Sequence, residues 1–227
     1  LNSGFLDFKI LSVDNNLNEN NQEINIAIKI SEGIQFKFGD LTFSGEKGSL
    51  SSETLKSYFS LKKDDIFNRQ IIIDDIQKII DLYSDQGYAF VDVNPITKDF
   101  LDTVSVDINI SLNKKVYINR IVISGNTRTQ DEVIRREIDI AEGGLYSRTT
   151  IKNSILKLRR LGYFSDVQMS ISEINGVKDK LDLFFEVEET KTGSLSFSIS
   201  HSNNYGIAIG TGIKEKNIFG SGNTLNA

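Results

Sequence analysis

Apolar and polar residues alternate in several short stretches of the chain, with the period of two that a β-strand shows when one of its faces is buried. One stretch lies near the start, at 24–30, and two more follow at 104–110 and 181–187. Their apolar positions are Ile24, Ile26, Ile28, Ile30, Val104, Val106, Ile108, Ile110, Leu181, Leu183, Phe185 and Val187. The alternation predicts three strands of the same kind.

A second pattern has the spacing of an α-helix that buries one apolar face. The two apolar stripes consist of Ile72, Ile76, Ile79, Ile80 and Tyr83, and of Ile151, Ile155 and Leu158. Gly87 and Gly162 follow these stripes, where a left-handed helix end is easiest for glycine. A further helix is predicted to begin at Thr129, because Thr129 and Glu132 have the spacing of a capping box.

These elements recur in the same order, so the chain contains repeated units. The strand-like segment 38–45 ends in Ser-Gly, as does the segment 117–125. Each unit reads strand, helix, helix, strand, strand. This order predicts an α+β fold in which a three-stranded mixed sheet packs on two helices.

The predicted boundaries are a partial unit at 1–33, whole units at 34–114 and 115–191, and a distinct tail at 192–227. The chain begins inside a repeat, so we expect it to be an excised piece of a longer protein.

The tail has its own pattern, in which apolar residues alternate with small or polar ones. Its apolar positions are Leu195, Phe197, Ile199, Ile207, Ile209 and Ile213. A membrane β-barrel strand gives this pattern, and so does a half-buried strand of a soluble sheet. Two strands cannot close a barrel, and open strand edges are not satisfied in lipid. We therefore expect this fragment to be soluble.

Composition narrows the classes of function. The net charge of −5 and the pI near 5.1 argue against a dedicated nucleic-acid binder, which usually carries a basic face. Zero cysteines exclude disulfides, thiol nucleophiles and thiolate metal sites, and the single histidine disfavours a histidine-based centre. Neither a membrane-spanning apolar helix nor a signal peptide is recognisable.

The sequence gives little support for a catalytic or metal-binding site. Asp64-Asp65 and Asp74-Asp75 offer carboxylates for a metal or for acid/base catalysis. The first pair falls in a predicted turn and the second on the predicted solvent side of a helix, so we expect solvated side chains. Ser44-Gly45 and Ser124-Gly125 lack the Gly-Lys-Ser/Thr of a phosphate-binding loop. The sequence predicts no catalytic residue, no metal site, no cofactor and no enzyme.

A set of short motifs, in a fixed order, resembles the BamA family of outer-membrane-protein assembly factors of Gram-negative bacteria. The motifs are Ser31-Glu32-Gly33, 121–127, 133–137, Glu142-Gly143, 160–164, 187–194 and 217–222. The resemblance covers nearly the whole chain. It implies the end of a third polypeptide-transport-associated (POTRA) domain, complete fourth and fifth POTRA domains, and the first strands of a truncated β-barrel.

The resemblance also implies a function. The chain would belong to a scaffold on the periplasmic face of the outer membrane that receives unfolded outer-membrane proteins and passes them to the barrel for insertion. It would need no ATP and no cofactor. The alternatives are a related POTRA-containing transporter, of the two-partner secretion or translocation-assembly type, or a periplasmic divisome-type adapter.

In the POTRA arrangement the strand after the second helix lies at the edge of the sheet, and here the matching segments are 88–93 and 165–171. An exposed edge can pair with an extended client through main-chain hydrogen bonds. The client-pairing residues are predicted to be Tyr88, Phe90, Val91, Val93, Ser165, Val167, Met169 and Ile171. Asp92 and Asp166 would limit self-association of the edges. The alternative is that a neighbour merely covers these edges.

The resemblance further implies docking of an accessory lipoprotein of the BamD type to the domain nearest the barrel. The matching charged residues are Arg135, Arg136 and Glu142, which follow the first helix of that domain. Asp139 stands where the family can place a basic residue. Complementary charges set docking specificity. The alternative is a solvated helix face.

Overall fold

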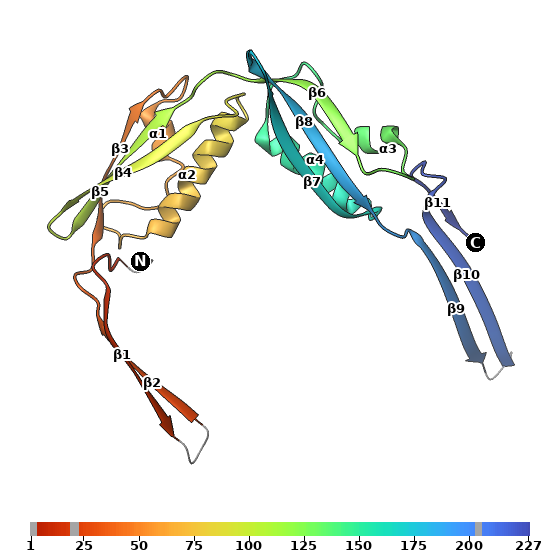
Figure 1. The fold of residues 1–227 in the computed structure, drawn as a ribbon, viewed down its shortest axis with the longest axis horizontal. Coiled ribbons are helices and arrows are strands. Elements are labelled where there is room, and N and C mark those ends of the chain that lie inside the picture. Colours follow the sequence, from red (N-terminus) through yellow and green to blue (C-terminus); the bar gives the residue numbers. More distant parts are fainter. Residues whose placement is uncertain (1–3, 19–22, 203–205) are drawn as a thin grey trace. The chain divides into compact units, whose positions relative to one another are not determined.

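The computed structural model describes residues 4–18, 23–202 and 206–227 (Figure 1). The elements in chain order are β1 Lys9–Asn18, β2 Glu23–Ser31, β3 Lys37–Gly45, α1 Ser52–Lys56, α2 Arg69–Ser84, β4 Asp92–Phe100, β5 Thr103–Ser111, β6 Tyr117–Ser124, α3 Asp131–Arg135, α4 Arg148–Arg160, β7 Phe164–Ile174, β8 Val177–Glu189, β9 Gly193–Ser202, β10 Gly206–Ile218 and β11 Asn223–Asn226.

The order strand, helix, helix, strand, strand occurs twice, from β3 to β5 and from β6 to β8, which confirms the α+β prediction. The two sheets have the strand orders β3-β5-β4 and β6-β8-β7. The central strand of each is parallel to the first strand and antiparallel to its sequence neighbour. One long helix, α2 or α4, lies beside each sheet in Figure 1.

Both central strands bury their alternate apolar residues, as predicted. The buried positions are Val104, Val106, Ile108 and Ile110 on β5, and Leu181, Leu183, Phe185 and Val187 on β8. They face the helix stripes, in which Ile79, Tyr83 and Leu158 are fully buried. These layers form the two cores. Burying one large aliphatic side chain contributes roughly 1.5–3 kcal/mol to the free energy of folding, so the cores stabilise the units.

The chain divides into two compact units, and the division does not follow the order of the repeats. The first unit contains Leu1–Tyr83 and Phe90–Asn113, and the second contains Ser84–Ala89 and Lys114–Ala227. In the second unit the Gly87 carbonyl accepts the Val116 N–H at 2.9 Å. The Asp85 carboxylate accepts the Thr149 N–H, also at 2.9 Å. The segment 84–89 is therefore an integral part of the second unit.

This segment corrects the first predicted client edge. Strand β4 begins at Asp92, so Tyr88, Phe90 and Val91 precede it and only Val93 lies on it. Gly87 has φ +99°, and the Ala89 N–H donates back to the Gly87 carbonyl at 3.0 Å. The chain turns here instead of extending, because Ala89 packs against the core of the second unit.

The predicted exposure of Asp75 is also wrong. Its side chain is 1% exposed, whereas the sequence predicted a solvent-facing carboxylate. Asp75 accepts the Ser60 N–H at 2.7 Å and a hydrogen bond from Lys78 at 2.7 Å. In the second unit Ser154 accepts the Asp139 N–H at 3.1 Å. The two acceptors stand 15 residues after their donors in both units, so each holds the loop that follows the short helix.

Each unit also contains a second sheet. β1 pairs with β2, and β9, β10 and β11 form a three-stranded sheet. Leu195, Phe197 and Ile199 on β9 are 60–78% exposed, and Ile209 lies opposite Ile199 on β10. Among the described residues, no helix is long and apolar enough to cross a membrane.

Candidate functional site

The strand orders put β4 and β7 at sheet edges, as predicted. β4 contains Pro95, and its register with β5 continues without interruption from Asp92 to Phe100. A proline has no N–H, so it fits a regular strand only where its nitrogen faces away from the partner. The free side of β4 therefore lacks a donor at Pro95, which weakens this edge as a template for another strand.

The edge of β7 has no proline, but its first free peptide groups already have partners. The Val167 N–H donates to Asp166 Oδ1 at 2.8 Å, and the Val167 carbonyl accepts from Arg159 at 3.0 Å. Since the N–H and C=O of one strand residue point to the same side, both groups face away from β8. Arg159 and Asp166 also form an ion pair at 3.5 Å.

The Asp166 carboxylate has a lowered pKa. The largest cause is the hydrogen bond from the Gln168 side chain at 2.8 Å, followed by the bond from the Val167 N–H and the nearby Arg159 charge. These bonds favour the ionised form, which is the form that accepts them. Asp166 therefore remains charged at neutral pH.

The other predicted residues of β7 differ in position. Met169 and Ile171 are two and four residues beyond Val167, so their peptide groups also face the free side. Ile171 is 40% exposed, while Met169 packs against the core. Ser165 lies at a register shift, and its hydroxyl donates to the Glu188 carbonyl at 3.2 Å. The main-chain groups on the free side of β7 that could bond another strand therefore lie at positions 167–171.

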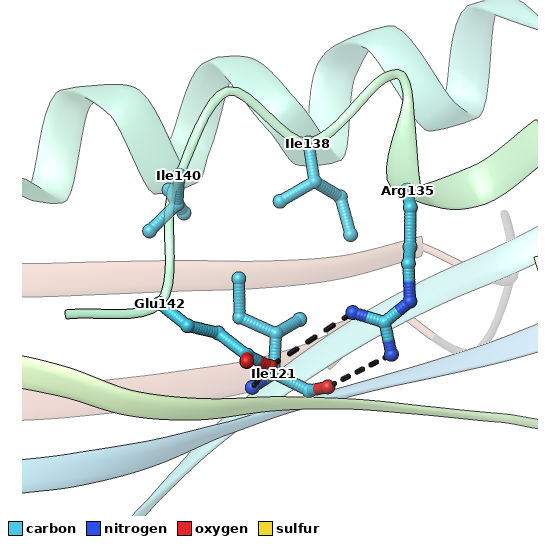
Figure 2. A pocket seen from close by; sticks show the side chains of 5 residues that line it. All are labelled: Ile121, Arg135, Ile138, Ile140 and Glu142. Carbon is cyan, nitrogen blue, oxygen red and sulfur yellow. Dashed lines mark hydrogen bonds and ion pairs between the residues drawn. The ribbon is translucent and has the colours of Figure 1, made fainter. Parts of the chain in front are cut away.

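The predicted lipoprotein-docking residues Arg135 and Glu142 line a hollow of about 270 Å³ together with Ile121, Ile138 and Ile140. Figure 2 shows the two charged side chains reaching toward Ile121 from opposite sides. Glu142 accepts the Ile121 N–H at 2.8 Å, and Arg135 donates to the Ile121 carbonyl at 3.2 Å. Their charged groups are 3.9 Å apart, and each side chain is about half exposed. The hollow thus combines apolar walls with one charge of each sign.

Arg136 lies away from this hollow. Its guanidinium is next to Gly222, where a Cβ would stand 2.5 Å from Nη2, and it pairs with Glu137 at 3.6 Å. Adjacent residues of a helix point about 100° apart, so Arg135 and Arg136 do not share one face. Asp139 pairs with Lys157 at 2.7 Å.

A partly buried polar network around Glu189 was not predicted from the sequence. Glu189 accepts main-chain N–H bonds from Thr127, Arg128 and Thr129 at 2.6–3.1 Å. Burial alone would raise the pKa of Glu189, but the hydrogen bonds from Thr129, Thr127 and Arg128 outweigh it and lower the pKa to about 2. In the sequence, only the Glu-Glu pair that ends β8 pointed to this network. The groups that Glu189 bonds lie 60–62 residues earlier, so the sequence alone did not connect them.

This network replaces the predicted capping box. Helix α3 has Gln130 as its N-cap, without a side-chain cap bond, so the prediction that Thr129 caps with Glu132 was wrong. The Thr129 hydroxyl instead accepts from the Asn217 amide at 2.9 Å. The Gln130 N–H donates to the Gly220 carbonyl at 2.9 Å. The end of the tail therefore supplies the acceptor that a capping side chain would provide.

Two glycines allow this close approach. A Cβ on Gly220 would lie 1.9 Å from the Arg128 carbonyl oxygen, and Gly220 has φ +72°. The Gly222 carbonyl accepts the Tyr163 hydroxyl at 3.1 Å. The turn 217–222 is thus fixed against the second unit.

In the ranges 4–18, 23–202 and 206–227, no group of three or more His, Cys, Asp or Glu side chains could hold a metal ion. The chemistry offered by the sites above is main-chain pairing and charge-assisted contact.

The POTRA family model, described as a surface antigen variable number repeat, matches residues 36–113 and 116–190. The outer membrane protein assembly factor BamA of Neisseria meningitidis serogroup B is 31% identical over 97% of this chain and 28% of its own length. BamA of Nitratidesulfovibrio vulgaris is 31% identical over 98% of this chain and 28% of its own length. The chain therefore spans less than a third of these curated relatives.

A solved structure shows the same fold. The crystal structure of Haemophilus influenzae BamA POTRA3-5 superposes with a TM-score of 0.71 at 28% identity. The match covers 83% of this chain and 75% of the solved chain.

Proposed function

Because this chain belongs to the POTRA family, we propose that it is part of the periplasmic region of an outer-membrane-protein assembly factor of the BamA type. In this role it is a binding scaffold, not an enzyme, and it needs no cofactor. It receives unfolded outer-membrane proteins by strand-edge pairing and passes them to the membrane-embedded part of the protein. The likeness to BamA relatives over nearly the whole chain supports this role.

The observation that carries the pairing mechanism is the edge strand β7. Its free side presents the main-chain groups of Met169 and Ile171, and those of Val167, which Asp166 and Arg159 bond in the free chain. Pairing through main-chain groups demands little of the client's sequence. A scaffold that serves many different clients needs this tolerance. The edge of β4 is less suitable, because Pro95 interrupts its row of donors.

The domain organisation follows the same proposal. Residues 1–33 complete one POTRA domain, 34–114 and 115–191 form two more, and 192–227 begin the barrel. The exposed apolar stripe of β9 and β10 supports the last assignment, because a barrel strand turns such residues toward lipid.

Photo-crosslinking tests the client edge. Ile171 is replaced by photoreactive p-benzoylphenylalanine, and a urea-unfolded outer-membrane protein is diluted into the 227-residue chain. We expect a crosslinked product that falls several-fold when Met169→Pro removes a free-side donor. Met169→Ala is the matched control, since it removes the same side chain but keeps the N–H. Equal crosslinking in a folded Met169→Pro variant would contradict the pairing mechanism.

The hollow between Arg135 and Glu142 is proposed as the docking site of an accessory lipoprotein of the BamD type. Half-exposed charges of both signs beside three isoleucines suit a partner with complementary charges around an apolar contact. Arg136 does not line the hollow, because it pairs with Glu137 beside Gly222. In this proposal it contacts the lipoprotein outside the hollow.

The docking test must separate charge from fold, because Glu142 also accepts the Ile121 N–H. Glu142→Gln keeps an acceptor oxygen but removes the charge, whereas Glu142→Lys reverses it. We expect weaker lipoprotein capture for Glu142→Gln, a larger loss for Glu142→Lys, and unchanged circular dichroism for Glu142→Gln. Wild-type capture by both variants would remove Glu142 from the docking site.

A further inference from the structure

Both edges of the second sheet carry the same arrangement. At β6 the peptide groups of Ile121 bond to Glu142 and Arg135, and at β7 those of Val167 bond to Asp166 and Arg159. In each case a carboxylate accepts the N–H and a guanidinium donates to the C=O. A neighbouring strand would bond the same N–H with its own C=O, and the same C=O with its own N–H. The carboxylate and the guanidinium therefore occupy the places of strand main-chain groups.

We propose that Arg159 and Asp166 act as a built-in competitor that closes the client edge of β7 until an extended strand displaces them. The inference rests on the proposed function of β7 and concerns how that site is regulated. The competitor occupies Val167 directly, so a client strand cannot bond this residue while the pair is in place.

The exposure of the pair makes displacement easy. Arg159 is 55% exposed and Asp166 is 41% exposed, so both charges become hydrated when they leave the edge. Exposed ion pairs contribute little to stability, and each group keeps other partners or water. Asp166 also retains its bond from Gln168 at 2.8 Å. The pair therefore lowers the affinity for a strand without blocking it.

The competitor also fits the chemistry of an edge that must not bind copies of itself. An unprotected edge strand pairs with other edges and promotes aggregation. β4 has a permanent block in Pro95, which no ligand can remove. β7 instead has a reversible block, which suits a site that opens only for a bound client.

The test measures the affinity of the 227-residue chain for a fluorescein-labelled peptide of alternating threonine and valine, by fluorescence polarisation. Removal of either partner, in Asp166→Ala or Arg159→Ala, should tighten binding roughly two- to fivefold, in line with the small energy of exposed pairs. The two substitutions change the net charge in opposite directions, so a shared gain cannot come from charge. Arg160→Ala is the matched control, because Arg160 is an exposed arginine of the same helix end.

The outcomes separate the two proposals. Tighter binding by Asp166→Ala and Arg159→Ala, lost again when Met169→Pro is added, supports the competitor. If the wild type binds and Met169→Pro weakens it, but neither substitution tightens binding, the competitor is overturned and the client edge stands. If no variant binds the peptide, both proposals fail.

Discussion

The side-chain amide of Asn217 donates to the hydroxyl of Thr129 at 2.9 Å, and these residues are 88 positions apart. Asn217 is 5% exposed and Thr129 is 3% exposed. Asn217 Oδ1 also accepts the Gly222 N–H at 2.7 Å, so the same side chain shapes the turn and attaches it. One buried amide therefore joins the turn 217–222 to Thr129, beside the bonds of Gly220 with Gln130 and of Gly222 with Tyr163.

Asn217→Ala should loosen this attachment. The substitution leaves the half-buried Gly222 N–H and the buried Thr129 hydroxyl with one partner fewer, which costs about 1–3 kcal/mol. Hydrogen exchange of the Gln130 amide should become faster, because Gln130 donates to Gly220 in the attached turn. Asn223→Ala is the control, since Asn223 is exposed and its side-chain amide donates to Ser221 in the neighbouring turn. Unchanged exchange in Asn217→Ala would show that the turn is held by other contacts.

Glu189 makes the stability of the second unit dependent on acid pH. Its pKa is about 2 in the folded chain, below the ordinary 4.5. The stabilisation is therefore complete above pH 4.5 and is lost as the pH falls toward 2. Glu189→Gln should be less stable than the wild type at neutral pH. The difference in free energy of unfolding, measured in urea at a series of pH values, should shrink below pH 4.5. A constant difference across the series would contradict this role.

Asp75→Ala should destabilise the first unit. The Ser60 N–H loses its charged acceptor, and an unmet hydrogen bond of this kind costs about 1–3 kcal/mol. Asp74→Ala is the matched control, because Asp74 is exposed on the same helix and surface substitutions usually change stability by less than about 0.5 kcal/mol. Thermal unfolding followed by circular dichroism compares the two. Similar midpoints for both variants would show that the buried carboxylate is dispensable.

Pro95→Val should increase self-association. Valine restores an N–H on the free side of β4, and a complete row of donors allows two copies to pair. Thr97→Val adds a β-branched apolar residue to the same strand without adding an N–H. Sedimentation velocity over a range of concentrations should show dimers for Pro95→Val and monomers for Thr97→Val. Equal behaviour of the two variants would remove Pro95 from the protection of this edge.

Local pattern was sufficient to predict the layers. The alternation at Val104 and Leu181 and the stripe from Ile72 to Tyr83 depend only on which face is buried, and the structure buries them. The fold class and the family followed from these elements and from motifs that lie within single elements.

The errors share a different cause. Asp75, Thr129 and Tyr88 were interpreted from their neighbours in sequence, but their surroundings come from distant segments. Thr129 bonds to Glu189 and Asn217, and the turn at Tyr88 follows from packing of Ala89 on the second core. The ion pairs that close the sheet edges were hidden for the same reason, because Arg159 meets Val167 only once helix and strand have packed.

The segment 84–89 has a consequence for how such repeats can be inherited. Gly87 accepts the Val116 N–H, and Asp85 accepts the Thr149 N–H at the start of α4, so six residues encoded with one repeat complete the next. A recombination event that exchanged residues 115–191 alone would separate Val116 and Thr149 from these acceptors. Neighbouring repeats of this kind must therefore evolve as compatible pairs, and a transplanted repeat keeps its stability only when it carries the last loop of its predecessor.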